Sequence, residues 1–249
     1  MKPGGPFSNL YGEGHYHAFI LTLSLTTESV RALLPGPLEL SPQSATTGGA
    51  HPVFFMFGHH TDVHSHLFRW PAMNYREFIL GVPCVQWKNP ALKHRGPFFY
   101  MPRLFLDSIP PIVLGWLYGF AKMLARIRLS ESDYRVDSLI WNRRLVKGQF
   151  KVKGQPESPS HFPLFTAVRE MLQQPFVGRT PLGIYRCSNF DWNFGEATIQ
   201  PVEAEMEIAE AFRPGVPVGR FSAKGIDEAP LGAFRIRTHW KLSVPMKCS

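Results

Sequence analysis

The sequence predicts an α+β protein that is mainly β, a barrel of mixed strands with a few flanking helices. First, many short segments of β-branched and aromatic residues lie between turn signals, and 21 Gly and 23 Pro are spread along the 249 residues. Second, only three segments carry helix signals. Third, no strand–glycine-rich loop–helix unit is present, so no nucleotide-binding fold and no bound cofactor are expected.

The clearest strand signature lies near the C-terminal end of the chain. There, Phe234, Ile236 and Thr238 alternate with Arg235 and Arg237, which is the period of two that a strand requires. Strands are expected over Tyr16–Leu25, Val53–Gly58, Tyr75–Trp87, Pro97–Leu106, Arg126–Asp137, Ser138–Lys153, Leu182–Trp192, Ala197–Ile208 and Ala233–Val244.

Three helices are expected between these strands. Thr26 or Thr27 can cap a short helix that runs to Leu34, before a proline. A second helix, from Ile112 to about Ala125, has apolar residues almost all round and is therefore expected to be buried. A third extends from about Pro163 to Gln174, with its apolar residues on one stripe.

Composition favours a single globular domain over residues 1–249. Hydrophobic residues make up 44% of the chain, which is ample for a core, and no repeat or long linker divides it. The formal net charge is +8, and its densest basic cluster, Arg143–Lys153, is interpreted as a β-hairpin around Gly148 with one solvated face. No nucleic-acid-binding motif accompanies that cluster, so no specific nucleic-acid partner is expected.

The sequence also favours a soluble, reduced protein of the cytoplasm. The longest apolar stretch, Pro110–Ala121, is about a dozen residues, whereas a membrane-spanning helix needs roughly 20, so no membrane partner is expected. The segment Met1–Gly14 has no secretory pattern. Three cysteines, Cys84, Cys187 and Cys248, are too few and too scattered for a disulfide framework or a zinc ribbon.

Lys122 is the first candidate for chemistry. It is the only charged residue between Asp107 and Arg126, in a stretch rich in Ile, Leu, Trp and Phe. Loss of water disfavours an ammonium and lowers its pKa, and a neutral amine can condense with a ketone or aldehyde to give an iminium. The alternative is a structural lysine whose charged end reaches solvent from the end of a buried helix.

Glu77 is the second candidate, in the segment from Tyr75 to Pro83. In a strand, Tyr75, Glu77 and Ile79 share one face. If that face points inward, Glu77 can transfer protons and burial would raise its pKa. A surface glutamate that pairs with a neighbouring strand explains the pattern equally well.

A third cluster could bind a metal. The run from His59 to His66 holds His59, His60, Asp62, His64 and His66, which are residue types that bind zinc and other divalent ions. No second cluster completes such a site, and solvated histidines are ordinary beside turns. No metal is therefore assigned.

The order of these features resembles the acetoacetate decarboxylase family over about Tyr16 to Pro245. The segment from Leu104 to Asp107, the prolines that follow, and the segment from Leu117 through Lys122 to Leu124 are similar to the family's Tyr-Leu-Asp, Pro-Ile and Gly-Phe-Pro-Lys-Lys-Leu. Tyr75-Arg-Glu77 resembles its Tyr-x-Glu. The segment Leu33–Leu38 and the closing strand add further matches.

The resemblance implies a closed β-barrel, a Schiff-base lysine at Lys122 and an acid/base glutamate at Glu77. Positions that would line the substrate pocket carry apolar or aromatic residues here: Tyr16, Phe57, Leu104, Trp116 and Met123. Tyr16 stands near the family's arginine, Phe57 near a second glutamate, and Met123 in place of the second lysine. Burial alone would then have to lower the pKa of Lys122.

The sequence therefore predicts a Schiff-base-forming lyase that acts on a keto acid or another carbonyl compound. Decarboxylation and aldol or dehydration chemistry both remain open. The alternative is a non-catalytic barrel that binds a small apolar ligand. By analogy with the family, the chain is expected to form a homo-oligomer.

Overall fold

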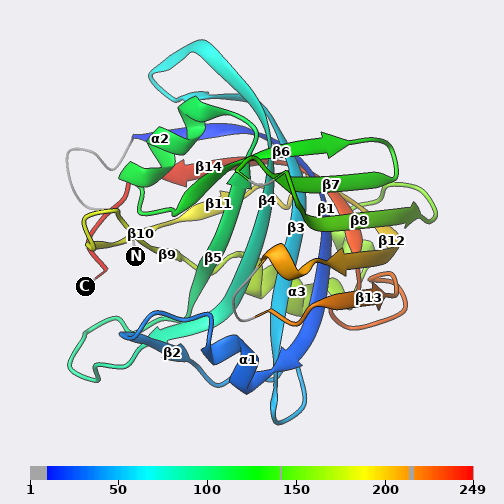
Figure 1. Cartoon of the computed structure of the whole chain (residues 1–249), viewed down its shortest axis with the longest axis horizontal. Helices are drawn as coiled ribbons and strands as arrows, with labels where there is room; N and C mark the ends of the chain where they lie inside the picture. The colour runs from blue at the N-terminus through cyan, green and yellow to red at the C-terminus, as the bar shows by residue number, and fades with distance from the viewer. Residues whose placement is uncertain (1–9, 141, 213–215, 249) are drawn as a thin grey trace.

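The computed structural model describes residues 10–140, 142–212 and 216–248, and most of them form strands (Figure 1). The strands are β1 (Tyr11–Thr26), β2 (Leu38–Leu40), β3 (Ala50–Ser65), β4 (Phe68–Trp87), β5 (Phe98–Leu106), β6 (Lys122–Leu129), β7 (Asp133–Ser138), β8 (Arg144–Val152), β9 (Phe176–Arg179), β10 (Tyr185–Ser188), β11 (Phe190–Trp192), β12 (Thr198–Ile208), β13 (Gly219–Ala223) and β14 (Phe234–Ser243). The helices are α1 (Thr27–Arg31), α2 (Ile109–Leu117) and α3 (Phe165–Leu172), with single 3₁₀ turns at Pro159–His161 and Glu210–Phe212. The mainly-β, α+β class is confirmed.

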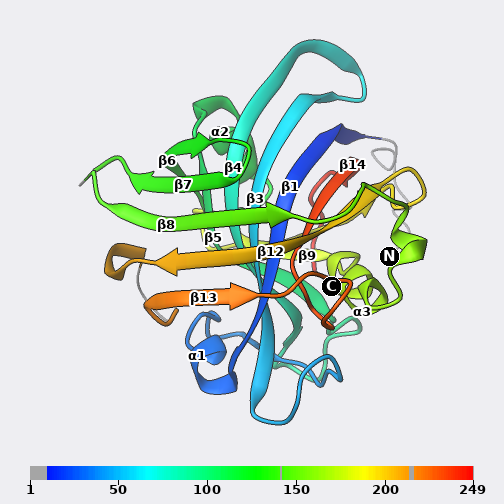
Figure 2. The same ribbon diagram turned by 90° about the vertical axis from the view of Figure 1, so that its right-hand side faces the viewer.

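Strand pairing forms a closed ring. β5 pairs with β6 in parallel and with β4 in antiparallel orientation, so hydrogen bonding passes around β5-β6-β7-β8-β12-β14-β1-β3-β4 and returns to β5. In Figure 2, β8 and β12 cross the long strands β1 and β3. Short strands extend this arrangement: β2 beside β4, β9 and β10 beside β5, β11 beside β14, and β13 beside β12.

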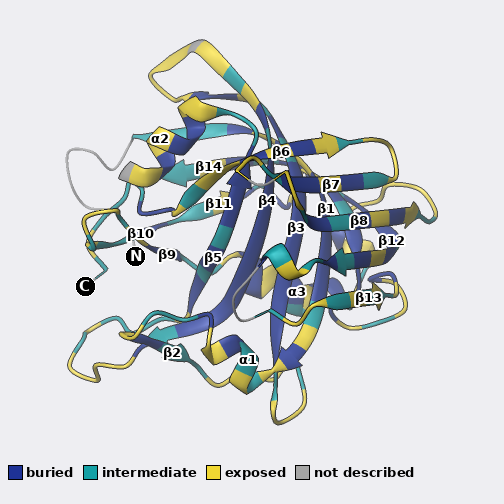
Figure 3. Ribbon diagram, viewed as in Figure 1, coloured by how far each residue is buried: buried dark blue, intermediate teal, exposed yellow. Residues whose placement is uncertain are grey.

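The long strands bury side chains on both faces, which gives two cores. We call the first the Phe57 core, because Phe57, Phe78 and Phe105 meet there with apolar residues of β7, β8 and β12. We call the second the Phe165 core, in which α3 and part of α2 cover the opposite face of β1, β3, β4 and β5. Figure 3 shows β3 and β4 as largely buried, as strands between two cores must be.

Two of the three helices follow the expectation, and α2 does not. Thr26 caps α1 by accepting a hydrogen bond from the backbone N–H of Ser29, and α3 lies within its predicted range. The prediction that the second helix continues to Ala125 is wrong. It ends at Leu117, because Gly119 adopts a φ of 82° and turns the chain into β6. It is not buried all round either, since Val113 is 50% exposed.

Several strand boundaries also differ from the prediction. The expected strand Arg126–Asp137 is two strands that turn around Ser130, and Leu182–Trp192 holds β10 and β11. The predicted hairpin at Gly148 is wrong, because β8 passes straight through that residue. A side chain at Gly148 would meet the Phe150 ring, whose atoms lie 2.6 Å from the ideal Cβ position. Gly148 therefore makes room for the Phe150 ring. In the sequence alone, a glycine with this role looks the same as a glycine in a turn.

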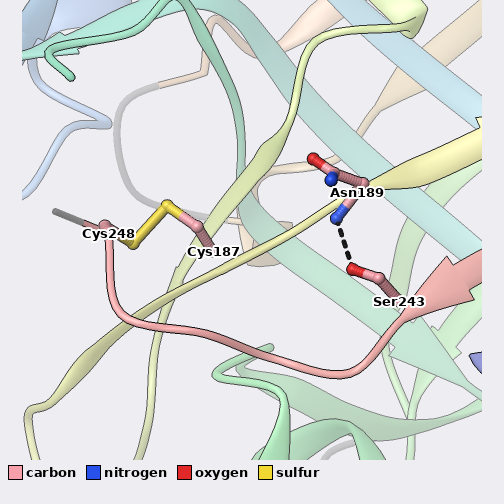
Figure 4. Close-up of a disulfide and its surroundings, with 4 residues drawn as sticks. All are labelled: Cys187, Asn189, Ser243 and Cys248. Atoms are coloured by element: carbon pink, nitrogen blue, oxygen red, sulfur yellow. Dashed lines mark hydrogen bonds between the residues drawn. A yellow bond between two sulfur atoms is a disulfide. The ribbon is translucent and has the colours of Figure 1, made fainter. Parts of the chain in front are cut away.

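The structure pairs two of the three cysteines, contrary to the expectation that they remain reduced. Cys187 in β10 and Cys248 form a disulfide across 61 residues, and Cys84 is free and buried (Figure 4). Backbone hydrogen bonds between Cys187 and Met246 bring the two segments together. The C-terminal segment is thus fastened to β10.

No helix in the described part of the chain is both long and apolar enough to cross a membrane. Residues 1–9, which form most of the segment in which we expected no secretory pattern, lie outside the described residues.

Candidate active site around Lys122 and Glu77

Lys122 is the first residue of β6, directly after the turn that follows α2. The parallel ladder places it beside Leu104 of β5, which in turn pairs with Ile79 of β4. Gly115 of α2 packs against the aliphatic part of the lysine: a Cβ at Gly115 would lie 2.3 Å from Cδ and 2.4 Å from Cε. The indole of Trp116 donates a hydrogen bond to the Lys122 carbonyl oxygen at 3.0 Å. The helix therefore fixes both the backbone and the side chain of this residue.

Glu77 lies on the same face of the sheet as Lys122. Residues paired across neighbouring strands point to the same side, so the row Ile79–Leu104–Lys122 shares its face with Glu77, two residues along β4. The glutamate is 5% exposed, and its Oε1 lies 2.6 Å from Nε2 of His60. From the other face, the Tyr134 hydroxyl lies 2.7 Å from the Glu77 carbonyl oxygen, which fixes the strand at this point.

The charges of Lys122 and Glu77 influence each other without an ion pair between them. Burial lowers the pKa of Lys122, and the negative charge of Glu77 partly opposes that shift. Burial alone would raise the pKa of Glu77, but His60 and then Lys122 outweigh it, and the pKa falls below its ordinary value. The sequence-based expectation of a raised pKa for an inward Glu77 is therefore wrong. His60, which the sequence did not connect to Glu77, is the reason.

A cavity of about 320 Å³ opens beside the lysine. Lys122 lines it together with Tyr75, Tyr118 and Phe120, and with His64 and Trp240 from β3 and β14. The Lys122 Nζ lies 5.7 Å from the centroid of the Tyr75 ring. Among the described residues, no arginine and no carboxylate lines this cavity. The site thus offers an amine of lowered pKa on the wall of a mainly apolar cavity.

Comparison with known protein families gives this geometry a context. The family model for acetoacetate decarboxylase matches residues 4–172, which is more than half of the chain and includes Glu77 and Lys122. The chain belongs to the acetoacetate decarboxylase family. A search by sequence against curated proteins finds no match.

Solved structures of the acetoacetate decarboxylase family share the fold. An acetoacetate decarboxylase from Legionella pneumophila is 16% identical with a TM-score of 0.64, covering 99% of this chain and 88% of that one. The enduracididine biosynthesis enzyme MppR, complexed with pyruvate, is 12% identical with a TM-score of 0.63, covering 96% and 90%. An acetoacetate decarboxylase-like enzyme from Sphingomonas wittichii RW1 is 12% identical with a TM-score of 0.60, covering 96% and 93%. At these identities the likeness establishes the fold.

Two of the five family-derived pocket residues, Leu104 and Tyr16, are buried beside Lys122 and beside His60 respectively, without lining the cavity. Leu104 is buried beside Lys122 in the β5–β6 ladder. Tyr16 is fully buried, with its ring centroid 4.4 Å from that of His60, and its hydroxyl has no partner among the described residues. Burial first, and the negative charge of Glu77 second, raise the pKa of Tyr16 well above its ordinary value. Both residues are buried and neither lines the cavity.

The other three lie elsewhere. Phe57 belongs to the Phe57 core on the opposite face, and Met123 points to that same face because it pairs with Phe105 in the register. Trp116 is 44% exposed on α2 and reaches the site only through its hydrogen bond to the lysine backbone. The cavity wall of this family member is therefore built mainly from residues that the resemblance did not name.

The histidine run from 59 to 66 divides between the two faces of β3. His60 bonds to Glu77, His64 lines the cavity, and His59 points to the opposite face. Within the described residues, no group of three or more His, Cys, Asp or Glu is arranged to hold a metal ion. His60 is the residue of the candidate site that the sequence did not connect to Glu77. Alternation alone puts it on one face of a strand, but only the register with β4 brings it to Glu77.

Proposed function

We propose that the chain is a Schiff-base-forming lyase in which Lys122 attacks the carbonyl group of a small substrate. The observation that carries the proposal is the half-buried Lys122, of lowered pKa, on the wall of a cavity of about 320 Å³, with the buried Glu77 on the same face of the sheet. At its ordinary pKa, a lysine is neutral to only about one part in 2,500 at pH 7. A lowered pKa increases the fraction of nucleophilic amine.

The reaction begins when the neutral nitrogen forms a bond to the carbonyl carbon and gives a carbinolamine. The former carbonyl oxygen then takes up a proton and leaves as water, and a protonated iminium remains on Lys122. When a bond to the neighbouring carbon breaks, its electron pair moves toward the iminium nitrogen and gives an enamine. If that bond led to a carboxylate, the product is CO₂. Protonation of the enamine carbon and hydrolysis then release a ketone and restore the amine.

We propose Glu77 as the proton acceptor for this lysine, because it lies on the same face and the charges of the two groups influence each other. Its lowered pKa keeps it as a carboxylate at neutral pH, so it can take the proton that the ammonium must lose before attack. His60 holds the carboxylate at 2.6 Å and fixes its direction. His60 is thus a positioning residue.

The cavity wall favours a substrate with an apolar body. No arginine on the described wall can pair with a substrate carboxylate. The groups on that wall that can carry positive charge are Lys122 and His64, each only in its protonated form. A charged group would lose water without a matched partner, which is costly in such surroundings. We expect an aldehyde, a ketone, or a keto acid with an apolar substituent.

The same wall supports the second candidate, a non-catalytic pocket for a small apolar ligand. If Lys122 were an ordinary cation, the cavity would still bind apolar molecules through Phe120, Tyr118 and Trp240. The pKa of Lys122 distinguishes the candidates. A value near 10 leaves almost no amine at pH 7 and favours the binding protein, whereas a clearly lower value favours the enzyme.

The experiment is reductive trapping. The protein is incubated with a panel of keto acids, ketones and aldehydes, reduced with borohydride, and analysed by intact mass and peptide mapping. We expect a covalent adduct on Lys122 that is lost in Lys122→Ala and retained in the matched surface variant Lys93→Ala. No adduct with any compound, or an equal adduct in Lys122→Ala, would contradict the proposal.

A further inference from the structure

Two sequence features that the proposed reaction does not use meet on the opposite face of the sheet. They are the alternating arginines of β14 and the histidine run of β3. In the register, Arg237 pairs with His17 of β1, His17 pairs with His59 of β3, and His59 pairs with Arg76 of β4. Four neighbouring strands thus place four basic side chains in one row.

Three residues of this row, Arg237, His17 and His59, border a cavity of about 210 Å³. His17, His59, Arg235 and Arg237 form its walls, and Phe19 lies at its base with Phe57. The turn between β6 and β7, residues 129–131, covers one side. Because a water molecule takes about 30 Å³ in the liquid, the space is sufficient for a small anionic group and a few further atoms.

Little protein counter-charge lies around this cavity, whose Arg237 and His17 are exposed to solvent. Arg76 is paired with Asp107 at 3.3 Å, and the Arg235 guanidinium donates to the side-chain oxygen of Gln200, which carries no charge. Arg237 makes no side-chain hydrogen bond or ion pair with any residue that the structure describes. Glu131 is the one carboxylate on the described wall, and it forms no ion pair.

The titration of the two histidines reflects this charge. The pKa of His17 is lowered by burial first and then by Arg237, His59, His15 and Arg235. The pKa of His59 is lowered by burial, Arg76 and His60, against a smaller opposing effect of Asp107. Both imidazoles are therefore neutral at pH 7. A bound anion would favour their protonated forms and would itself be bound more tightly by them.

We infer that this cavity is a binding site for the oxyanion group, phosphate or carboxylate, of a small molecule. Arg237 and Arg235 supply the charge and the planar N–H donors that such groups bind, and the ring nitrogens of His17 and His59 supply further donors. The inference does not depend on the lyase reaction. Lys122 of β6 and Glu77 of β4 lie on the other face of the sheet, so either site can exist without the other.

The test uses the full chain, with sulfate as the first probe because its charge is constant between about pH 5 and 8. Binding is followed by the NMR signals of the His17 and His59 imidazoles, at constant ionic strength maintained with chloride. We expect saturable shifts, an affinity at least tenfold lower in Arg237→Gln, and tighter binding of sulfate as the pH falls through the histidine titration. Lys93→Gln, which removes one charge from the exposed β4–β5 loop, should bind as the unchanged protein does.

Inorganic phosphate and acetate then distinguish the two oxyanion classes. Tighter binding of phosphate identifies a phosphorylated small molecule, and tighter binding of acetate identifies an organic acid. Shifts that do not saturate, or an Arg237→Gln variant that folds normally and binds sulfate as well as the unchanged protein, would overturn the inference. Borohydride trapping at Lys122 should be unaffected by Arg237→Gln.

Discussion

The two faces of the central strands carry opposite kinds of sites. On one face, Lys122 lines a mainly apolar cavity and burial lowers its pKa, and the buried Glu77–His60 pair lies on the same face. On the other face, Arg235 and Arg237 place positive charge beside a smaller cavity. Residues that are adjacent in the sequence serve different faces: His59 and His60 are one peptide bond apart and belong to different sites. A strand buried on both sides can therefore support two unrelated chemistries.

The difference also shows how a pKa is controlled in each site. Burial is the largest influence on Lys122 and on His17 alike, and it lowers the pKa of both. At Lys122 the nearest charge is negative and opposes the shift, whereas at His17 the nearest charges are positive and reinforce it. Three variants can break or sharpen this contrast.

The largest effect is expected for His60→Phe. It removes the partner of a buried carboxylate, which should cost about 3 kcal/mol of unfolding free energy at pH 7. In the unchanged protein the pKa of Glu77 is lower in the folded than in the unfolded state. This difference stabilises the fold at pH values above the unfolded-state pKa, and the stabilisation is lost as the pH falls through the folded-state pKa. In the variant, burial raises that pKa, so the difference between the two proteins should shrink toward about pH 4. Urea unfolding at several pH values measures it.

A stability difference that stays constant between neutral and acid pH would show that His60 acts by packing alone. Sulfate binding at the opposite face provides the control, because His60→Phe leaves both arginines in place. A His60→Phe variant that is folded but loses sulfate binding would mean that the two faces are coupled through His59.

The second variant is Gly115→Ala, which acts on the lysine without touching its charge. In a helix alanine is normally favoured over glycine by about 1 kcal/mol. Here the added methyl group would lie 2.3 Å from the Lys122 Cδ and would move the side chain. We expect trapping at Lys122 to slow by about 30-fold, which corresponds to about 2 kcal/mol, while the fold is kept. Gly36→Ala is the matched control, since no atom lies within 4 Å of its added methyl group.

Trapping rates that are equal in Gly115→Ala and Gly36→Ala would mean that the helix does not position the lysine. Circular dichroism of both variants distinguishes a moved side chain from a lost fold.

The smallest effect is expected for the stability of Arg237→Gln. Removing one of two neighbouring guanidinium groups relieves repulsion, so the anion-free variant should be more stable by less than about 1 kcal/mol. Sulfate should reverse this order, because only the unchanged protein gains binding energy from it. Thermal unfolding with and without sulfate tests both signs. A variant that is less stable in both buffers would show that Arg237 has a packing role.

The sequence predicted the elements with simple local signals and missed those that depend on distant contacts. The alternation in β14 and the cap at Thr26 are local, and both were confirmed. The end of α2 was missed because the apolar pattern continues through Phe120, while Gly119 leaves the helix to pack against Gly178. The disulfide was missed because its cysteines meet only after β10 pairs with the C-terminal segment.

For the site, sequence reasoning named Lys122 and Glu77, whose roles remain predictions, and it failed to connect His60 with Glu77. These two residues are 17 positions apart, and a shift of one residue in the β3–β4 register would place them on opposite faces. The same holds for the basic cavity. Arg235, Arg237 and His59 were each noticed, but the pairing of four strands decides that they are neighbours.

The passage from α2 into β6 links the position of the Lys122 side chain to a helix at the periphery. Lys122 starts a parallel ladder of only three residue pairs, and the helix before it is largely solvent-exposed. A substitution such as Gly115→Ala on that helix is expected to move the Lys122 side chain, since the added methyl group would meet its Cδ and Cε. Substitutions in α2 among related proteins can therefore change the reactivity of this lysine through a surface helix, with little effect on the stability of the fold.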